Sequence, residues 1–108
     1  MISSFIEMNE DEAVWFMKGF QKLSQCEKNI VTFLLSQPDH SYFGTNVSLA
    51  EQMENPYSYN SEMSRALSQL SGKAIVIIHE PVKWYNRVIE LSENWIEQMI
   101  TFGKEEEK

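Results

Sequence analysis

The sequence predicts a mainly α-helical protein with one β-hairpin near its C-terminal end. Apolar residues recur at the spacing of helices through most of the chain, whereas the segment after Gly72 is β-branched and contains Pro81. The composition, with 43% hydrophobic residues and only 4 Gly and 3 Pro in 108 residues, is typical of one compact core. We therefore expect a single domain over residues 1–103 and a charged tail over 104–108.

The first helix is predicted over residues 10–24, where apolar side chains follow a helical repeat and three acidic residues occupy the first turn. Val14 and Trp15 widen its apolar surface beyond one stripe. Two interpretations are open: this surface covers the domain's own core, or it pairs with a second copy of the chain. The candidate dimerisation residues on the two terminal helices are Val14, Trp15, Met17, Phe20, Trp95, Ile96 and Met99.

Two capping-box patterns predict the next two helices. Ser24 and Glu27 have the required spacing and introduce a helix over 25–36. Ser48 and Glu51 repeat that spacing and introduce a short helix, which a following proline ends. The segment between these two helices contains Pro, Asp and Gly, so it is expected to be a connecting loop.

The fourth predicted helix covers residues 61–71, with Asn60 as its N-cap and Gly72 in the left-handed conformation just after its end. Two strand-like runs follow, at 74–79 and 87–91, and they predict a β-hairpin with its turn between them.

Ser92 is predicted to cap a last helix over 92–102.

The chain is acidic, with a formal net charge of -7, but the acid is concentrated at the two ends. Residues 57–91 hold four basic and three acidic side chains, a net charge of +1. Because phosphate binding depends on Lys and Arg, this distribution is compatible with a modest positive face on an acidic body.

Enzymatic and membrane functions find little support in the residues. No apolar run reaches the roughly 18–20 residues needed to cross a bilayer, and the N-terminus lacks the pattern of a signal peptide, so we expect a cytoplasmic protein without a membrane partner. His40 and His79 have no second ligand at metal-binding spacing, and no phosphate-binding or nucleophile motif occurs. Cys26 lies among apolar residues and is expected to be an unreactive buried thiol. We expect no metal, no cofactor and no catalysis.

The order of these elements resembles a known family. Residues 24–95, and above all the run VSLAEQMENPYSYNSEMSRALSQLSGKAIVIIHEPVKWYNRVIELSENW, look like a winged helix-turn-helix domain of the kind found in MarR-like and other small prokaryotic or phage regulators. The ending ALSQLSGKAIV is similar to the end of the family's recognition helix. The resemblance implies a winged-helix core over 25–91 with an additional helix on each side.

The same resemblance implies a transcription regulator that binds double-stranded DNA as a homodimer. Helix 61–71 would enter the major groove, and the segment 80–87 would form a wing on the DNA backbone. The implied DNA-binding residues are Ser61, Ser64, Arg65, Ser68, Gln69, Lys73, Lys83, Trp84, Tyr85, Asn86 and Arg87.

Two alternatives remain beside this hypothesis. The polar side of helix 61–71 is also what an ordinary solvated helix presents. The acidic ends and the exposed aromatic residues would equally suit a winged-helix module that binds a protein partner rather than DNA.

Overall fold

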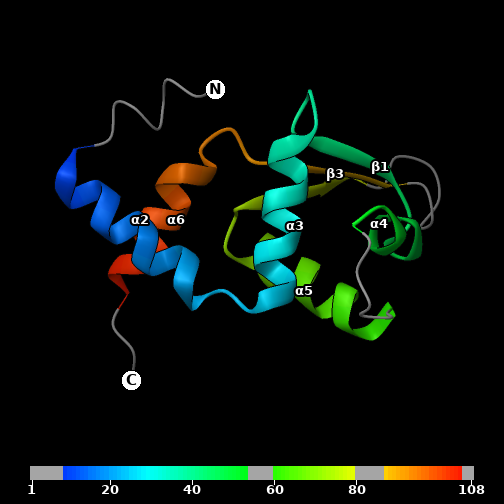
Figure 1. Cartoon of the computed structure of the whole chain (residues 1–108), viewed down its shortest axis with the longest axis horizontal. Coiled ribbons are helices and arrows are strands. Elements are labelled where there is room, and N and C mark those ends of the chain that lie inside the picture. Colours follow the sequence, from blue (N-terminus) through cyan, green and yellow to red (C-terminus); the bar gives the residue numbers. More distant parts are fainter. Residues whose placement is uncertain (1–8, 54–59, 80–86, 106–108) are drawn as a thin grey trace.

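The computed structural model describes residues 9–53, 60–79 and 87–105 of the chain. These residues form helices and one small antiparallel sheet (Figure 1). In chain order the elements are α2 (Glu10–Lys22), α3 (Gln25–Ser36), β1 (Ser41–Gly44), α4 (Asn46–Gln52), α5 (Asn60–Gly72), β2 (Val76–His79), β3 (Arg87–Leu91) and α6 (Trp95–Lys104).

The sheet has the strand order β1-β3-β2, so β3 is its central strand. The two strands of the predicted hairpin pair in antiparallel fashion, with Ile78 of β2 opposite Ile89 of β3, and β2 begins two residues later than predicted. The other neighbour of β3 is β1, in which Tyr42 is opposite Ile89. The sequence predicts a loop rather than a strand at β1, because this strand has only four residues and ends in a glycine. Its partner β3 is more than forty residues away in the sequence, so the pairing leaves no local signal.

The core lies between α3, α5 and the inner face of the sheet. The apolar positions that predict α5 are buried, and most of those that predict α3 are buried as well, with Phe33 and Leu35 half-buried. The side chains with almost no exposed surface are Ile30, Val31, Leu34, Leu49, Met63, Leu67, Leu70, Ile75, Val76, Ile89 and Met99.

Helices α2 and α6 pack closely together at one end of the molecule, and α3 lies between this pair and α4 (Figure 1). The two backbones meet at a pair of glycines. A Cβ atom on Gly19 would overlap the carbonyl oxygen of Met99, and one on Gly103 would overlap the carbonyl oxygen of Trp15. Only glycine therefore allows this approach. Beside it, the rings of Phe16 and Trp95 make an edge-to-face contact with centroids 5.6 Å apart.

The N-cap of helix α4 lies three residues earlier than predicted. This N-cap is Thr45, whose side chain accepts a hydrogen bond from the backbone N–H of Ser48, while the Ser48 hydroxyl accepts one from the N–H of Thr45. The predicted cap, Ser48, is thus the third helical residue. The spacing of Ser48 and Glu51 alone does not identify a cap, because it can also occur inside a helix. Here Thr45 caps the helix instead.

Gly72 is not the left-handed residue that the sequence predicts. Helix α5 includes Gly72, and the residue with positive φ after the helix is Ala74, at 62°. The helical hydrogen-bond pattern continues one residue further, because the N–H of Lys73 donates to the carbonyl of Gln69 at 3.1 Å. The chain reverses only at the next residue.

The last helix also differs from its prediction at both ends. Ser92 does not cap it, because α6 begins at Trp95 and its N-cap residue is Asn94. At the other end α6 continues through Gly103 and Lys104, beyond the predicted limit of 102. No helix among the residues described is long and apolar enough to cross a membrane.

Candidate nucleic-acid interface

Helix α5 has one buried and one exposed side. Met63, Ala66, Leu67 and Leu70 are buried, as the helical repeat predicts. The opposite side is exposed and consists of polar residues. They are Glu62, Ser64, Arg65, Ser68 and Gln69. The candidate base-reading residues of α5 that the structure describes therefore share one solvent-facing surface, which we call the α5 polar face.

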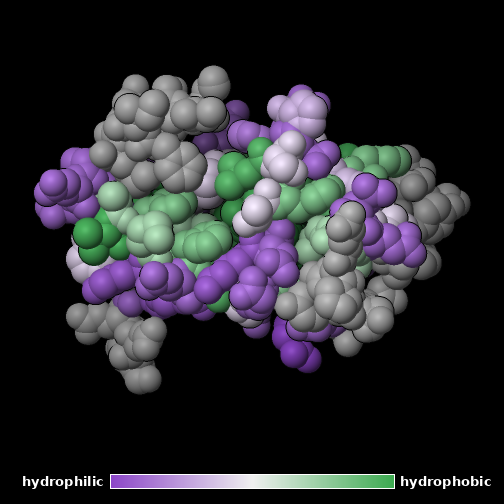
Figure 2. All heavy atoms as spheres, viewed as in Figure 1, coloured by the Kyte–Doolittle hydropathy of each residue, from purple (hydrophilic) through white to green (hydrophobic). Residues whose placement is uncertain are grey.

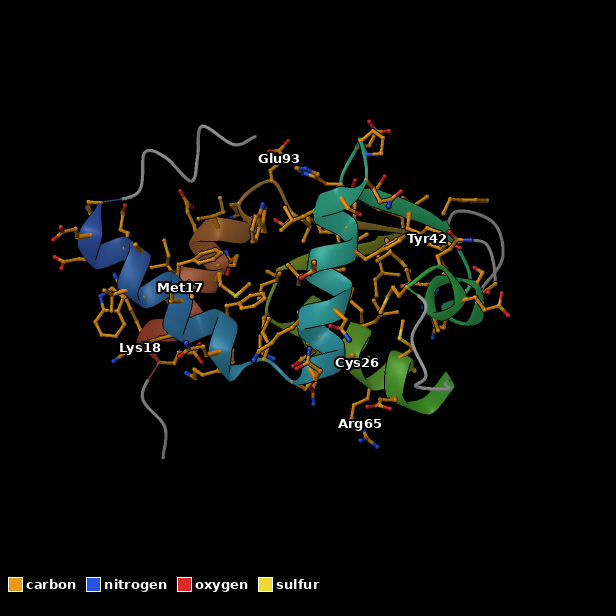
Figure 3. The ribbon with its side chains drawn as sticks, in the orientation of Figure 1. Met17, Lys18, Cys26, Tyr42, Arg65 and Glu93 are labelled. Atoms are coloured by element: carbon orange, nitrogen blue, oxygen red, sulfur yellow. The ribbon has the colours of Figure 1, made fainter. Side chains whose placement is uncertain are left out.

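Arg65 is the cation of this face. Its side chain is exposed and extends away from the ribbon on the outer side of α5 (Figure 3). A guanidinium group in this position can reach a base edge or a phosphate without losing a contact that holds the fold. The side chain of the remaining candidate on this helix, Ser61, lies outside the described part of the structure.

Lys73 lies just beyond α5, but its side chain is directed into the molecule. Its Nζ is 3.6 Å from Oε2 of Glu27 and 4.8 Å from the ring centroid of Phe102, and its side chain is 25% exposed. A phosphate contact would have to compete with both interactions. A lysine directly after a recognition helix predicts a phosphate contact. The sequence gives no sign that Lys73 instead pairs with Glu27.

Glu27 explains why Lys73 is held in place. Its carboxylate is buried; Oε1 accepts a hydrogen bond from the N–H of Ser24 at 2.6 Å, and Oε2 has no hydrogen-bond partner among the described residues. The nearby Lys73 ammonium is the charge that compensates this oxygen. The capping box predicts the first contact of Glu27 from sequence, but nothing local predicts the second.

Arg87 begins the strand that follows the predicted wing. It lies opposite Gly44 of β1, and its guanidinium donates a hydrogen bond to the side-chain oxygen of Asn46 on α4. Arg87 therefore links the start of β3 to α4. The other wing candidates, Lys83, Trp84, Tyr85 and Asn86, lie outside the described residues.

Cys26 is buried, as predicted, with its Sγ 3.6 Å from Sδ of Met63. Burial, together with the negative charges of Glu62 and Glu27, raises the pKa of its thiol from 9.0 to about 11. The thiol is therefore protonated at neutral pH, and a nucleophilic role at this position has no structural support.

The two histidines also lack the surroundings of a metal centre. His79 lies on β2, and its Nε2 is 2.9 Å from Oε2 of Glu90 on the neighbouring strand. Within the described ranges, no group of three or more His, Cys, Asp or Glu side chains could hold a metal ion.

The candidate dimerisation residues do not all face the same way. Trp95 and Met99 are buried inside the chain, where α6 meets α2 and the core. Trp15, Phe20 and Ile96 are half-buried. Val14 and Met17 are 53% and 51% exposed, so the apolar surface open to a second copy lies on the outer side of α2.

An apolar surface that the sequence analysis does not single out lies on the outer face of the sheet. Phe43 of β1 is 62% exposed and Ile77 of β2 is 39% exposed. Val88 is the residue opposite Phe43, and Glu90 is the residue opposite Ile77. Because β1 was expected to be a loop, its alternation of inward and outward side chains could not be used to find this surface.

Comparisons with protein-family models, with curated proteins and with solved structures find no match for this chain.

Proposed function

We propose that this protein is a winged helix-turn-helix regulator that binds double-stranded DNA through the α5 polar face. The observation that carries the proposal is the position of α5. It follows α4 after a short connection, packs its apolar side on α3 and α4, and precedes a hairpin in a sheet of order β1-β3-β2. A helix held in this way, with a polar outer face, is what major-groove recognition requires.

The residue types on the α5 polar face suit base reading. Arg65 can donate two hydrogen bonds to the O6 and N7 atoms of a guanine, and Gln69 can pair with adenine. Ser64 and Ser68 can contact bases or phosphates. A helix of 13 residues is about 20 Å long, which is enough to present this face along one stretch of the groove.

The proposed wing covers residues 80–87 and would lie on the DNA backbone beside the groove. In this proposal Lys83 and Arg87 contribute phosphate contacts, with Trp84, Tyr85 and Asn86 beside them. The role of Lys73 becomes structural, because Glu27 already occupies its ammonium group.

The net negative charge of the protein is expected to limit its affinity for DNA. With a net charge of -7 and few exposed cations on the proposed face, one copy would bind weakly and lose affinity as salt rises. We therefore propose that a homodimer acts on DNA in the cytoplasm, with binding rather than catalysis as its function. Two copies double the phosphate contacts and match a two-fold symmetric site.

The experiment compares two variants, each of which loses one positively charged side chain. Fluorescence anisotropy would follow a labelled duplex taken from the region upstream of the protein's own gene, over a series of salt concentrations. Arg65→Ala is expected to weaken binding by about 5- to 150-fold, the loss of one good base contact. Lys104→Ala, which removes an exposed cation on α6, is the control and is expected to change affinity little. Equal effects of the two substitutions, or wild-type binding that does not depend on salt, would count against the proposal.

A second candidate function is binding of a protein partner through the outer face of the sheet. The observation that favours it is the exposed apolar pair Phe43 and Ile77 beside the carboxylate of Glu90. Such a surface suits a partner segment with apolar and basic side chains. If it operates, Phe43→Ser would reduce binding of that partner while Arg65→Ala would leave it unchanged.

A further inference from the structure

The exposed surface of helix α2 is apolar in the middle of the helix and charged toward both of its ends. Val14 and Met17, the two exposed apolar residues, lie in the middle of the helix. Figure 2 shows hydrophobic surface over α2, bordered by hydrophilic side chains at each end of the helix. The inner side of α2 contacts α6, whereas the side chains of Val14 and Met17 are 53% and 51% exposed.

The charges on α2 are separated along its length. Its first turn carries Glu10, Asp11 and Glu12, and its second half carries Lys18 and Lys22. Lys22 is occupied, because its Nζ donates to the carbonyl oxygens of Phe102 and Glu105 at the end of α6. Lys18 is exposed, with its Nζ 5.0 Å from the ring centroid of Trp15. The exposed side of α2 is therefore acidic at one end and basic at the other.

We propose that α2 pairs with α2 of a second copy in an antiparallel arrangement. A helix that is acidic at one end, apolar in the middle and basic at the other is complementary to its own reversed copy, and a two-fold symmetric contact requires such a surface. Asp11 and Lys18 are seven residues apart, about two turns, so they lie on the same side of the helix with Val14 between them. Antiparallel pairing centred between Val14 and Trp15 brings Asp11 of each copy level with Lys18 of the other.

The size of the contact determines its strength. Two helices of 13 residues bury less than the roughly 800 Å² per partner of a standard interface, so we expect a dimer that dissociates in the micromolar range or above. Helix α2 lies at the end of the molecule away from α4 (Figure 1). The proposed pairing rests on α2 alone and does not depend on DNA binding.

The test is sedimentation equilibrium of the full chain without DNA, at concentrations from about 10 to 500 µM, which bracket the expected dissociation constant. The wild type is expected to pass from a mass of 12.6 kDa to twice that value. Met17→Asp is expected to raise the dissociation constant at least tenfold. Thr32→Asp, the same charge added at an exposed position of α3, is the matched control and should leave it unchanged.

Charge exchange tests the antiparallel geometry. Asp11→Lys and Lys18→Asp are each expected to weaken the dimer, because each places like charges level with one another, while the double substitution restores opposite charges and recovers at least half of the lost association free energy. Circular dichroism would verify that each variant keeps its helices. A wild type that stays at 12.6 kDa at every concentration would overturn the proposal, as would a double variant no better than the single ones.

Discussion

Lys73 and Glu27 connect three parts of the molecule. Glu27 lies in the first turn of α3, Lys73 follows α5, and the ring of Phe102 on α6 contacts the ammonium groups of both Lys73 and Lys22. Because the carboxylate of Glu27 is buried, removing its cation would leave a charge with poor solvation. The pair therefore matters for stability more than an exposed ion pair would.

We expect Lys73→Met to lower the free energy of unfolding by about 1–2 kcal/mol, less than a fully buried pair would cost because Lys73 is partly exposed. Thermal unfolding would show this as a fall in Tm of about 4–8 °C per kcal/mol. Lys104→Met, at an exposed position, is the control. Adding Glu27→Gln to Lys73→Met should recover part of the loss, because it removes the unpaired charge. Equal Tm values for the two lysine variants would show that the contact contributes nothing.

The Cys26 thiol gives a prediction about pH. Its folded-state pKa, about 11, is higher than the unfolded value of 9.0. Its contribution to stability is therefore fully present below pH 9 and is lost as pH rises toward 11, because the unfolded chain releases this proton first. We expect chemical denaturation to show falling stability over this range, and Cys26→Ala to reduce the slope. An identical slope in the variant would contradict the shift. Thiol labelling at pH 8 should likewise be slow in the folded protein and fast in denaturant.

The close contact between α2 and α6 depends on Gly19 and Gly103. A side chain at either position would overlap backbone atoms of the other helix. A methyl group at Gly103 would meet the backbone of Trp15, and backbone moves less easily than the end of a flexible side chain. Gly72, by contrast, ends α5 with no atom within 4 Å of the place a Cβ would take. The two positions form a natural pair for comparison.

Gly103→Ala is expected to destabilise the protein by at least about 1–3 kcal/mol, the usual effect of overpacking. Gly72→Ala is expected to stabilise it by about 0.4–1 kcal/mol, because alanine restricts the unfolded chain and meets no clash in the folded one. Urea denaturation of both variants would measure the difference. A Gly103→Ala variant as stable as the wild type would mean that α2 and α6 are not in close contact.

The elements that sequence predicts best are those whose signals are local. Helix α3 spans the predicted residues 25–36, because its capping box and its apolar repeat lie within one short segment. The N-cap of α4 lies three residues before the predicted one, since Thr45 and Ser48 both have the chemistry of an N-cap. The positive φ falls at Ala74 rather than Gly72, because the hydrogen bond from Ile75 to Leu70 fixes where the chain turns.

The same difference between local signals and contacts that are distant in the sequence applies to the candidate site. The exposed position of Arg65 could be read from the helical repeat of α5, which needs no knowledge of the rest of the fold. The inward direction of Lys73 could not, since Glu27 lies 46 residues earlier in the chain. The burial of Trp95 and Met99 likewise depends on how α6 packs against α2, which no local pattern specifies.

Two surfaces of the molecule have different proposed roles. The α5 polar face would contact DNA, and the outer side of α2 would join two copies. The negative charge lies mainly in the two ends of the chain, while the proposed DNA-binding segment 57–91 has a net charge of +1. A dimer would therefore bring two such segments to one DNA site and gain affinity from both.

Contact between α5 and DNA can be observed by nuclear magnetic resonance of the ¹⁵N-labelled protein titrated with a short duplex at low salt, where non-specific binding is sufficient. We predict that the backbone signals of α5 at Ser64, Arg65 and Ser68 shift, together with those of the wing over 80–87, and that added salt reverses the shifts. Signals of the outer sheet face at Phe43 and Ile77 should stay in place. Shifts confined to that sheet face, or no shift at any protein concentration, would contradict DNA binding through α5.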